Sequence, residues 1–407
     1  MARVLENIGK ELLRKNRIPT PDFLVASDAK EARKAADELG YPVVIKALVA
    51  VGKRGKAGAV KFAENSDEAE RIAQEILSMT VRNFPVERLL VEKKLDISGE
   101  LYVSITFDSS KGMPVIIASS AGGIDVEEIA EKEPEKIIKH HVNPWEGLHL
   151  YQAKEIWSDL GISGGLLQKA TTILGRLYNV FVKYDATIIE INPLAVTSEG
   201  DLVAAAILMG VDEEALYRQP DLSDKVEAGS DRSWRPLTDL EKKMVAVDAS
   251  ESYRGTARYT EMEGGDIGFF CGGGGGSLLV YDALLRFGGK PANYTEFGGN
   301  PTETKVTGLA KGVLSKSGVK SFLMCGNITN NTQTDVVAKG IINAFQEMNT
   351  DLNKFPVVIR LAGVNEAEAK RLFSEAGVEY YGDEITMEDA AQMIVDKMKE
   401  TYPEEGR

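Results

Sequence analysis

Residues 267–276 read IGFFCGGGGG, an apolar run that predicts a buried strand, followed by five glycines that lead into a helical pattern. The same order of strand, loop and helix follows SFLMC at residues 321–325 and PVVIRL at residues 356–361. Three such units in series predict a parallel, doubly wound sheet. Ligands of such sheets bind beyond the carboxyl ends of the strands, so these loops are the first place to look for a site.

The loops after these strands have a composition that suits an anionic, polyoxygenated ligand. Glycine lets backbone amides approach a ligand, and a helix N-terminus carries about half a positive charge. The candidate residues for binding such a ligand are Gly273, Gly274, Gly299, Asn330, Asn331, Thr332 and Arg360. A helix is expected from about residue 333, so Asn330, Asn331 and Thr332 can either bind an anion or cap that helix.

The first part of the chain mixes strands and helices without strict alternation, which predicts an α+β domain. Residues 217–239 are polar, contain proline and lack periodicity, so they are the expected linker. A chain of 407 residues has room for two or three domains. We expect an amino-terminal domain at 1–238 and a carboxyl-terminal domain at 239–407.

A lysine at the end of a strand stands beside a cationic loop in the first domain. The strand is VVIK at residues 43–46, and the loop is GKRGKAG at residues 52–58. Fixed charge on a strand and mobile amides on a loop suit a nucleoside triphosphate. The loop lacks the GxxxxGK[ST] pattern of a P-loop, and a solvated basic turn is the alternative.

The segment IIEINP at residues 188–193 places two oxygen-bearing side chains on one strand face. Side chains alternate along a strand, so Glu190 and Asn192 point to the same side. Carboxylate and amide oxygens are ligands that Mg²⁺ accepts. Solvent-facing polarity of an edge strand is the other interpretation.

Composition excludes several classes of partner. Lys and Arg number 48 against 62 Asp and Glu, a net charge of −14 that disfavours nucleic acid and anionic membrane surfaces. No apolar run approaches the roughly 20 residues that span a bilayer. Cys271 and Cys325 cannot form a disulfide framework, which favours a reducing, cytoplasmic compartment and a role as buried apolar residues. Histidine is scarce, with three in the chain.

The motifs in this order resemble an ATP-grasp domain followed by a CoA-ligase domain, as in the β subunit of the succinyl-CoA synthetase superfamily. The stretches that carry the resemblance are GKRGKAGAVK, LVEKKLDISGELYV, GGIDVEEIAEKEPEKI, IEINPL and YRQPD. The carboxyl-terminal half is most similar to citryl-CoA synthetase and the amino-terminal part of ATP citrate lyase, through GGGGGS followed by Asp282, ANYTEFGGNP and GNITNNT.

The resemblance implies an α/β architecture in which a two-lobed ATP-grasp domain precedes a flavodoxin-like CoA-ligase domain. It implies the reaction ATP + acid + CoA → acyl-CoA + ADP + phosphate, through a phosphohistidine and an acyl phosphate, with citrate as the expected acid. The ATP-binding residues by this resemblance are Lys46, Lys53, Arg54, Gly55, Glu92, Leu95 and Glu100. Asn192 would help to hold Mg²⁺, and Glu190 would face the phosphohistidine of an α-type partner subunit that also binds CoA.

Two positions depart from the family pattern. Ala206 stands where the family has an aspartate that ligates Mg²⁺, and Asp212 or Asp185 is the expected substitute. Arg360-Leu361 replaces the tandem arginines of the citrate branch, whereas Gly272 replaces an asparagine typical of succinate enzymes. Succinate or malate therefore remains an alternative substrate, and a non-catalytic binding subunit is the alternative that Ala206 suggests. A carboxylase-type ATP-grasp enzyme is disfavoured because it needs no acid-binding glycine loops.

Overall fold

The structure, a computed structural model, describes residues 2–52, 54–123, 134–226 and 235–403. Lys53 and parts of GGIDVEEIAEKEPEKI and of the expected linker lie outside this range. The chain divides into two compact units, Met1–Pro236 and Leu237–Arg407. The assignment of functions to 1–238 and 239–407 stays a prediction.

Among its described residues, an antiparallel sheet of seven strands forms the centre of the first unit. Its order is β1-β13-β11-β8-β9-β10, with β12 beside β11. The strands are β1 (Ala2–Val4), β8 (Ile97–Asp108), β9 (Met113–Ser119), β10 (Ile137–His141), β11 (Ala186–Thr197), β12 (Leu202–Ala204) and β13 (Ile207–Val211). The helical elements of this part are α1 (Glu6–Lys15), η1 (Pro134–Lys136), α5 (Leu150–Asp159), α6 (Gly164–Lys183) and η2 (Glu213–Arg218).

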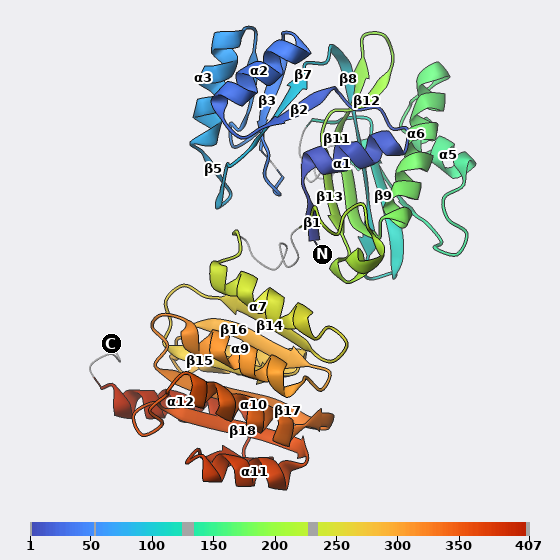
Figure 1. The fold of residues 1–407 in the computed structure, drawn as a ribbon. Coiled ribbons are helices and arrows are strands. Elements are labelled where there is room, and N and C mark those ends of the chain that lie inside the picture. The colour runs from blue at the N-terminus through green and yellow to red at the C-terminus, as the bar shows by residue number, and fades with distance from the viewer. Residues whose placement is uncertain (1, 53, 124–133, 227–234, 404–407) are drawn as a thin grey trace. The chain divides into compact units, whose positions relative to one another are not determined.

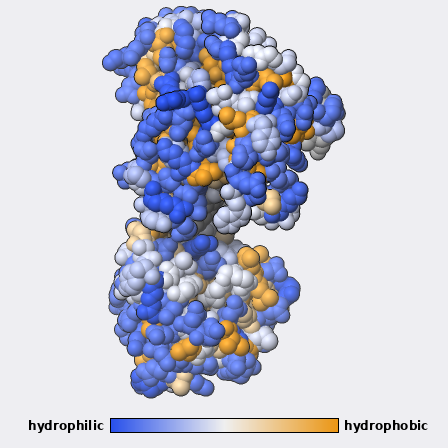
Figure 2. Space-filling model, turned by 90° about the vertical axis from the view of Figure 1, so that its right-hand side faces the viewer, coloured by the Kyte–Doolittle hydropathy of each residue, from blue (hydrophilic) through white to orange (hydrophobic). Residues whose placement is uncertain are grey.

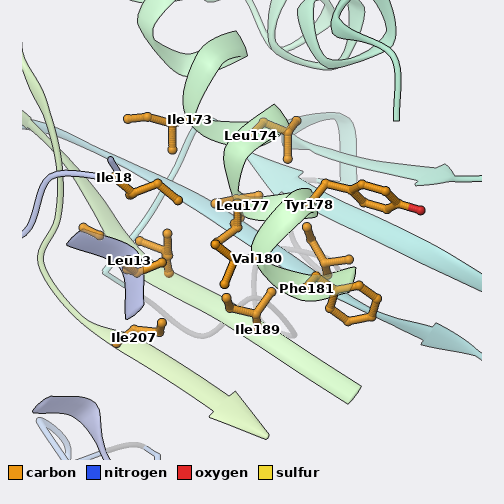
Figure 3. Packing of buried hydrophobic residues seen from close by; sticks show 14 of the residues in the cluster. Leu13, Ile18, Ile173, Leu174, Leu177, Tyr178, Val180, Phe181, Ile189 and Ile207 are labelled. Atoms are coloured by element: carbon orange, nitrogen blue, oxygen red, sulfur yellow. The ribbon is translucent and has the colours of Figure 1, made fainter. Parts of the chain in front are cut away.

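Apolar side chains at helical spacing fasten α6 to this sheet. Leu174, Leu177 and Phe181 follow one another at three- and four-residue intervals and are all buried. They pack with Ile189 of β11 and with Leu13 of α1 in one cluster (Figure 3). The packing leaves the opposite face of β11 available for polar side chains, because side chains alternate along a strand.

A smaller sheet of order β2-β7-β3-β4 belongs to the same unit. Its β-branched strand β3 is buried, and α2 and α3 cover the sheet (Figure 1). Asp28 and Asn65 cap these two helices by accepting bonds from backbone N–H groups of their first turns. The elements are β2 (Phe23–Ala26), α2 (Ala29–Leu39), β3 (Val43–Ala47), β4 (Val60–Ala63), α3 (Ser66–Leu77) and β7 (Leu89–Lys93), with a separate hairpin of β5 (Thr80–Val81) and β6 (Phe84–Pro85).

The second unit contains the doubly wound sheet expected from the sequence, in the order β14-β16-β15-β17-β18-β19. All pairs are parallel except that of the edge strand β14 with β16. Helices α7, α9, α10 and α11 contribute to the buried cluster on one face, and α8 and α12 to the cluster on the other. The prediction of an α/β fold with a parallel sheet is confirmed.

The strands of the second unit are β14 (Thr256–Glu261), β15 (Ile267–Gly272), β16 (Asn293–Gly298), β17 (Ser321–Gln333), β18 (Val357–Val364) and β19 (Tyr380–Tyr381). Its helices are α7 (Asp239–Ser250), α8 (Gly274–Arg286), α9 (Glu303–Ser315), α10 (Thr334–Glu347), α11 (Glu366–Glu375) and α12 (Met387–Thr401). Cys271 and Cys325 lie opposite each other on β15 and β17, both buried and unbonded. Burial raises the pKa of the Cys325 thiol to about 12, so both cysteines act as apolar core residues, as expected.

Apolar side chains gather mainly in the interior of each unit. On the face drawn in Figure 2, hydrophobic residues form small separate areas among hydrophilic ones. No helix within the described ranges has the length and apolar content needed to cross a membrane.

Candidate nucleotide and acid sites

A buried cluster of charged side chains in the first unit is the most unusual feature of the described chain. Lys46 of β3 and Glu92 of β7 face Glu6 and Lys10, which lie one turn apart on α1. All four residues are less than 10% exposed. Buried charges are expensive unless each has partners, so this group must form a connected network.

The lysines hold the network together through shared acceptors. Lys46 Nζ lies 2.6 Å from Glu92 Oε2 and 3.4 Å from Glu6 Oε1, and it donates to the carbonyl of Ala205 at 2.9 Å. Lys10 Nζ lies 3.0 Å from Glu6 Oε1, pairs with Glu92, and donates to the same carbonyl at 2.8 Å. The link between β12 and β13 is therefore tied to α1, β3 and β7.

The network shifts the pKa of its members in opposite directions. Burial alone would raise the pKa of Glu6, but the charges of Arg54, Lys10 and Lys46 lower it well below its usual range. Burial alone would lower the pKa of Lys46, but Glu6 and Glu92 raise it. For Lys10 burial prevails, and its pKa is lowered. Lys46 thus stays cationic at neutral pH, as binding to a phosphate requires.

Arg54 connects the glycine-rich loop to this cluster. Its guanidinium pairs with Glu6 and donates to the carbonyl of Ala47 at 3.1 Å. The turn that follows is closed by bonds from Gly58 N to Gly55 O and from Ala59 N to Arg54 O, both 3.0 Å. Gly55 is exposed in this turn. The structure therefore places Lys46, Arg54 and Glu92 in one cluster with Gly55 close to it along the chain, and Lys53 lies outside the described residues.

Glu190 and Asn192 lie on the polar face of β11, opposite the face that Ile189 and Ile191 bury. The register of β11 against β8 gains one residue between Ile191 and Leu194, which is a β-bulge at Asn192. Asn192 Oδ1 accepts a bond from Gly123 N at 2.8 Å. The arrangement on one face agrees with the alternation expected from the sequence.

Neighbouring strands add polar groups to the same face. Tyr102 of β8 donates through its hydroxyl to Glu190 Oε2 at 3.2 Å. Glu100 lies two residues earlier on β8 and therefore faces the same side. A Cβ on Gly123 would lie 2.0 Å from the Glu100 carboxylate, so glycine is needed there and Glu100 lies beside the bond to Asn192. Leu95 is half-buried in the link between β7 and β8.

The expectation that Asp212 or Asp185 replaces the missing aspartate is wrong. Ala186 pairs with Val211, so both aspartates lie at the opposite end of β11 and β13 from Asn192. Seven residues of strand correspond to roughly 20 Å. Asp185 instead pairs with Arg218 at 2.7 Å, and Asp212 caps η2 by accepting from Glu214 N.

The sequence predicts a strand that includes Ala206, but β12 ends at Ala204 and Ala206 lies in the link between β12 and β13. Its carbonyl accepts from Asn192 N at 3.3 Å, so it does stand next to Asn192. Among the residues that the structure describes, no group of three His, Cys, Asp or Glu side chains could hold a metal. Glu190 and Asn192 fit a Mg²⁺ that takes its remaining ligands from water and phosphate oxygens, which is the usual mode for this ion.

The second unit brings Gly273 and Gly274 to the N-terminus of α8. Gly273 has φ +98°, and a Cβ there would lie 3.0 Å from the amide nitrogen of Asn327, so the side chain of Asn327 fits against a bare backbone. A Cβ on Gly274 would lie 3.6 Å from Glu296 Oε2. Glu296 also accepts from Ser277 Oγ at 2.9 Å, so a carboxylate of the chain itself stands at this helix N-terminus.

Asn330, Asn331 and Thr332 do not cap α10. The register of β17 against β18 passes from Thr329–Gly363 to Gln333–Val364, so these three residues form a bulge in the strand. The N-cap of α10 is Gln333, which makes no side-chain capping bond. The capping interpretation is therefore wrong. Asn330 and Asn331 are exposed and Thr332 is buried, and binding of an anionic ligand by these residues stays a prediction.

The loop of Gly299 and Asn300 meets this bulge. Both residues have positive φ, and Asn300 Oδ1 accepts from Gln333 N at 3.1 Å. Arg360 is buried on β18, opposite Cys325 of β17. Its guanidinium donates to the carbonyls of Gly326 and, at 3.2 Å, Ile385, so its position is fixed by backbone acceptors.

Comparison with known proteins follows this division of the chain. Residues 3–196 match the family model of the ATP-grasp domain, and residues 235–397 match that of ATP citrate lyase citrate-binding. The β subunit of ADP-forming succinate–CoA ligase from Halorubrum lacusprofundi is 38% identical over 397 residues, which cover 97% of this chain and 98% of the relative. The chain belongs to the family of β subunits of ADP-forming CoA ligases. The β-subunit relative from Rubrobacter xylanophilus is also 38% identical, over 395 residues.

The fold of this β subunit is also that of a solved structure. ATP citrate lyase from Methanothrix soehngenii, in complex with citrate and coenzyme A, superposes with a TM-score of 0.80 at 19% identity. The alignment covers 97% of this chain and 99% of that one. As a member of this family, the β subunit has an ATP-grasp domain, and nucleotide binding by its first unit follows from that membership.

Glu6 and Lys10 are part of the β subunit's charged cluster that the motifs did not reveal. Their signal was an acid–base pair four residues apart in MARVLENIGKELLRK, in register with the buried Leu13. A charged pair on the buried side of a helix calls for buried partners elsewhere.

Proposed function

We propose that this chain is the nucleotide-binding β subunit of a citrate–CoA ligase that forms ADP. It acts with an α-type subunit that binds CoA and carries the phosphorylated histidine. The reaction is ATP + citrate + CoA → citryl-CoA + ADP + phosphate. The observation that carries the choice of citrate is the match of residues 235–397 to a citrate-binding family model, over nearly the whole second unit.

In this proposal the charged cluster receives the nucleotide. Lys46 and Arg54 neutralise phosphate oxygens, and the exposed turn with Gly55 supplies backbone amides. Leu95 and Glu100 lie beyond the end of β7, where the base and ribose would bind. Mg²⁺, when bound through Asn192 and Glu190, compensates phosphate charge.

Glu190 has the geometry of a group that steers the partner's histidine. Its carboxylate is held by Tyr102 on an otherwise polar strand face, so it can accept the second ring N–H of an imidazole and keep the other nitrogen nucleophilic. The acid binds at the carboxyl edge of the second unit, where Gly273, Gly299, the bulge of Asn330–Thr332 and the anchored Arg360 supply amides and charge.

The test is to purify the chain with its α-type partner and follow CoA thioester formation with citrate, succinate and malate. Citrate is expected to give the highest kcat/KM. The names of the 38% identical relatives favour succinate as the second candidate, and a higher kcat/KM for succinate would overturn the choice of citrate.

Ala206 supports a further alternative, a binding subunit that does not use ATP. Calorimetry with Mg·ATP separates the two, because a catalytic β subunit must bind the nucleotide. Absence of binding by a folded chain, with a functional complex, would favour the non-catalytic role.

A further inference from the structure

Lys10 has no role in the proposed function, yet it is one of the most completely buried charges in the described chain. Its side chain is 0% exposed, whereas those of Lys46 and Arg54 are 10% and 12% exposed. No phosphate can reach the Lys10 ammonium without rearrangement of the surrounding side chains. Its function must therefore pass through its neighbours.

Lys10 and Lys46 have the same three partners. Each contacts Glu6, Glu92 and the carbonyl of Ala205. Without a bound nucleotide, the two carboxylates have three cationic partners, because Glu6 also pairs with Arg54. The second lysine becomes necessary if the first one moves away from the carboxylates to bind a ligand.

Binding of a triphosphate creates that situation. Lys46 and Arg54 would turn toward phosphate oxygens, and Glu6 and Glu92 would lose two of their three cations. A buried carboxylate without a counter-ion is strongly disfavoured and takes up a proton. Lys10 is the cation that stays.

We infer that Lys10 is a positioning residue, a resident counter-ion that holds Glu6, Glu92 and the Ala205 carbonyl in place while Lys46 and Arg54 engage the nucleotide. The inference rests on the proposed nucleotide role of the cluster. Because Ala205 N bonds to Pro193 O at 3.1 Å, the same lysine also fixes the segment beside Asn192.

The experiment is calorimetry of Mg·ATP binding to the full chain in two buffers with different ionisation enthalpies, which gives the number of protons bound with the nucleotide. The wild type is expected to take up close to none. Lys10→Met should take up a proton and bind at least about tenfold more weakly, a change equal to ~1.4 kcal/mol. Lys15→Met is the matched control, since Lys15 lies on the same helix in a surface pair with Asp221.

A second pair of variants separates charge from packing if Lys10→Met folds poorly. Lys10→Gln keeps a long polar side chain without charge and should take up the proton, whereas Lys10→Arg keeps the charge and should not. Equal proton numbers and affinities for wild type, Gln and Arg variants would overturn the role of Lys10. A wild-type chain that binds no Mg·ATP would instead overturn the proposed function, and the two failures are thus distinct.

Discussion

Glu190 illustrates how one side chain is prepared for chemistry by its strand. The face that it shares with Asn192 is opposite the apolar face of β11, and the Tyr102 hydroxyl restrains its carboxylate. Neither residue is needed for the buried core. Substitution at this position should therefore change function more than stability.

We predict that Glu190→Gln lowers phosphorylation of the partner's histidine by about 10²–10⁴-fold, the usual contribution of a positioned acid–base group. The affinity for Mg·ATP should fall by a much smaller factor, because Asn192 and the Lys46 cluster still contact the metal and the phosphates in the proposed complex. Rapid-quench measurement of phosphohistidine with labelled ATP, beside calorimetry, separates the two effects. Tyr102→Phe removes the hydroxyl that restrains the Glu190 carboxylate, and it should lower the phosphorylation rate less than Glu190→Gln does. An equal loss of rate in both variants would contradict the proposed role of Glu190.

Glu6 allows a prediction of pH dependence. Its pKa is lowered in the folded protein, so the unfolded chain binds more protons in acid and the stabilisation present at pH 7 is lost as the pH falls. Glu6→Gln should cost about 3–5 kcal/mol at pH 7, since it breaks a buried ion network. The cost should fall by about 1.4 kcal/mol for each pH unit below the usual carboxyl range.

Urea unfolding followed by tryptophan fluorescence measures the free energy of unfolding of the Glu6→Gln variant at each pH, because Trp157 is buried in the same unit. Glu11→Gln is the control on the same helix, where the pair with Lys225 at 3.4 Å is exposed and worth less than about 1 kcal/mol. A cost for Glu6→Gln that does not change between pH 7 and pH 3.5 would rule out the ionised network as its source.

At the residue scale, the sequence predicts the functional residues that belong to short, recognisable motifs. Lys46, Arg54 and Glu92 were chosen from their motifs, and the structure places them together. The sequence does not predict the roles of Glu6 and Lys10, because they pair with residues distant in the chain. Lys10 and Glu92, for example, are 82 residues apart. Charge alternation on a helix is common at surfaces, so only the fold shows that this pair is buried.

Among the elements, β17 differs most from its expected form. The sequence predicts a strand at 321–325 and a loop to about 333, but the strand pairs with β18 as far as Gln333. The polar composition of Asn327–Thr332 hid this pairing, because β-propensity is weaker than the pairing offered by a neighbouring strand. The strands β14, β16 and β19 were also missed, of which β14 and β19 form the edges of the sheet and β16 lies between β14 and β15.

Close contact between α9 and α10 gives a prediction at the scale of elements. A Cβ on Gly340 of α10 would lie 2.7 Å from Val306 of α9, and the site is buried. Gly340→Ala should therefore destabilise the second unit by about 1–3 kcal/mol through overpacking. Hydrogen exchange by mass spectrometry should show faster exchange in peptides of both helices.

Gly275 of α8 is the matched control, because no atom lies within 4 Å of the Cβ that alanine would add. Gly275→Ala should be neutral or slightly stabilising, by less than about 1 kcal/mol. Protection of α9 and α10 that is unchanged in Gly340→Ala would show that the two helices move apart without cost.

For the molecule as a whole, the sequence was sufficient for the class of fold and the order of its parts. Periodicity and glycine positions revealed the doubly wound sheet, and the described residues form four buried clusters that each lie within one unit. The site of the first unit was harder to predict, because it combines a helix, two sheets and the link at Ala205 that lie far apart in sequence.

Because no buried cluster crosses from one unit to the other among the described residues, we predict that the two units unfold in two thermal steps. Differential scanning calorimetry of the full chain should resolve two transitions, and Mg·ATP at a hundred times its Kd should stabilise the first unit by about 2.7 kcal/mol. Fluorescence of Trp157, which is buried in the first unit, identifies that transition. A single transition that moves as a whole with nucleotide would contradict independent cores.

The pairing of the chain's first residues has a consequence for synthesis on the ribosome. Ala2 pairs with Val211, and Lys10 donates to Ala205, 195 residues later. At about 5–20 residues per second, roughly 10–40 s pass between translation of these partners. During this interval the charges of α1 lack the Ala205 carbonyl and β1 lacks its neighbouring strand. Codon usage and chaperone access across this stretch therefore bear on how much of the newly made protein acquires its nucleotide site.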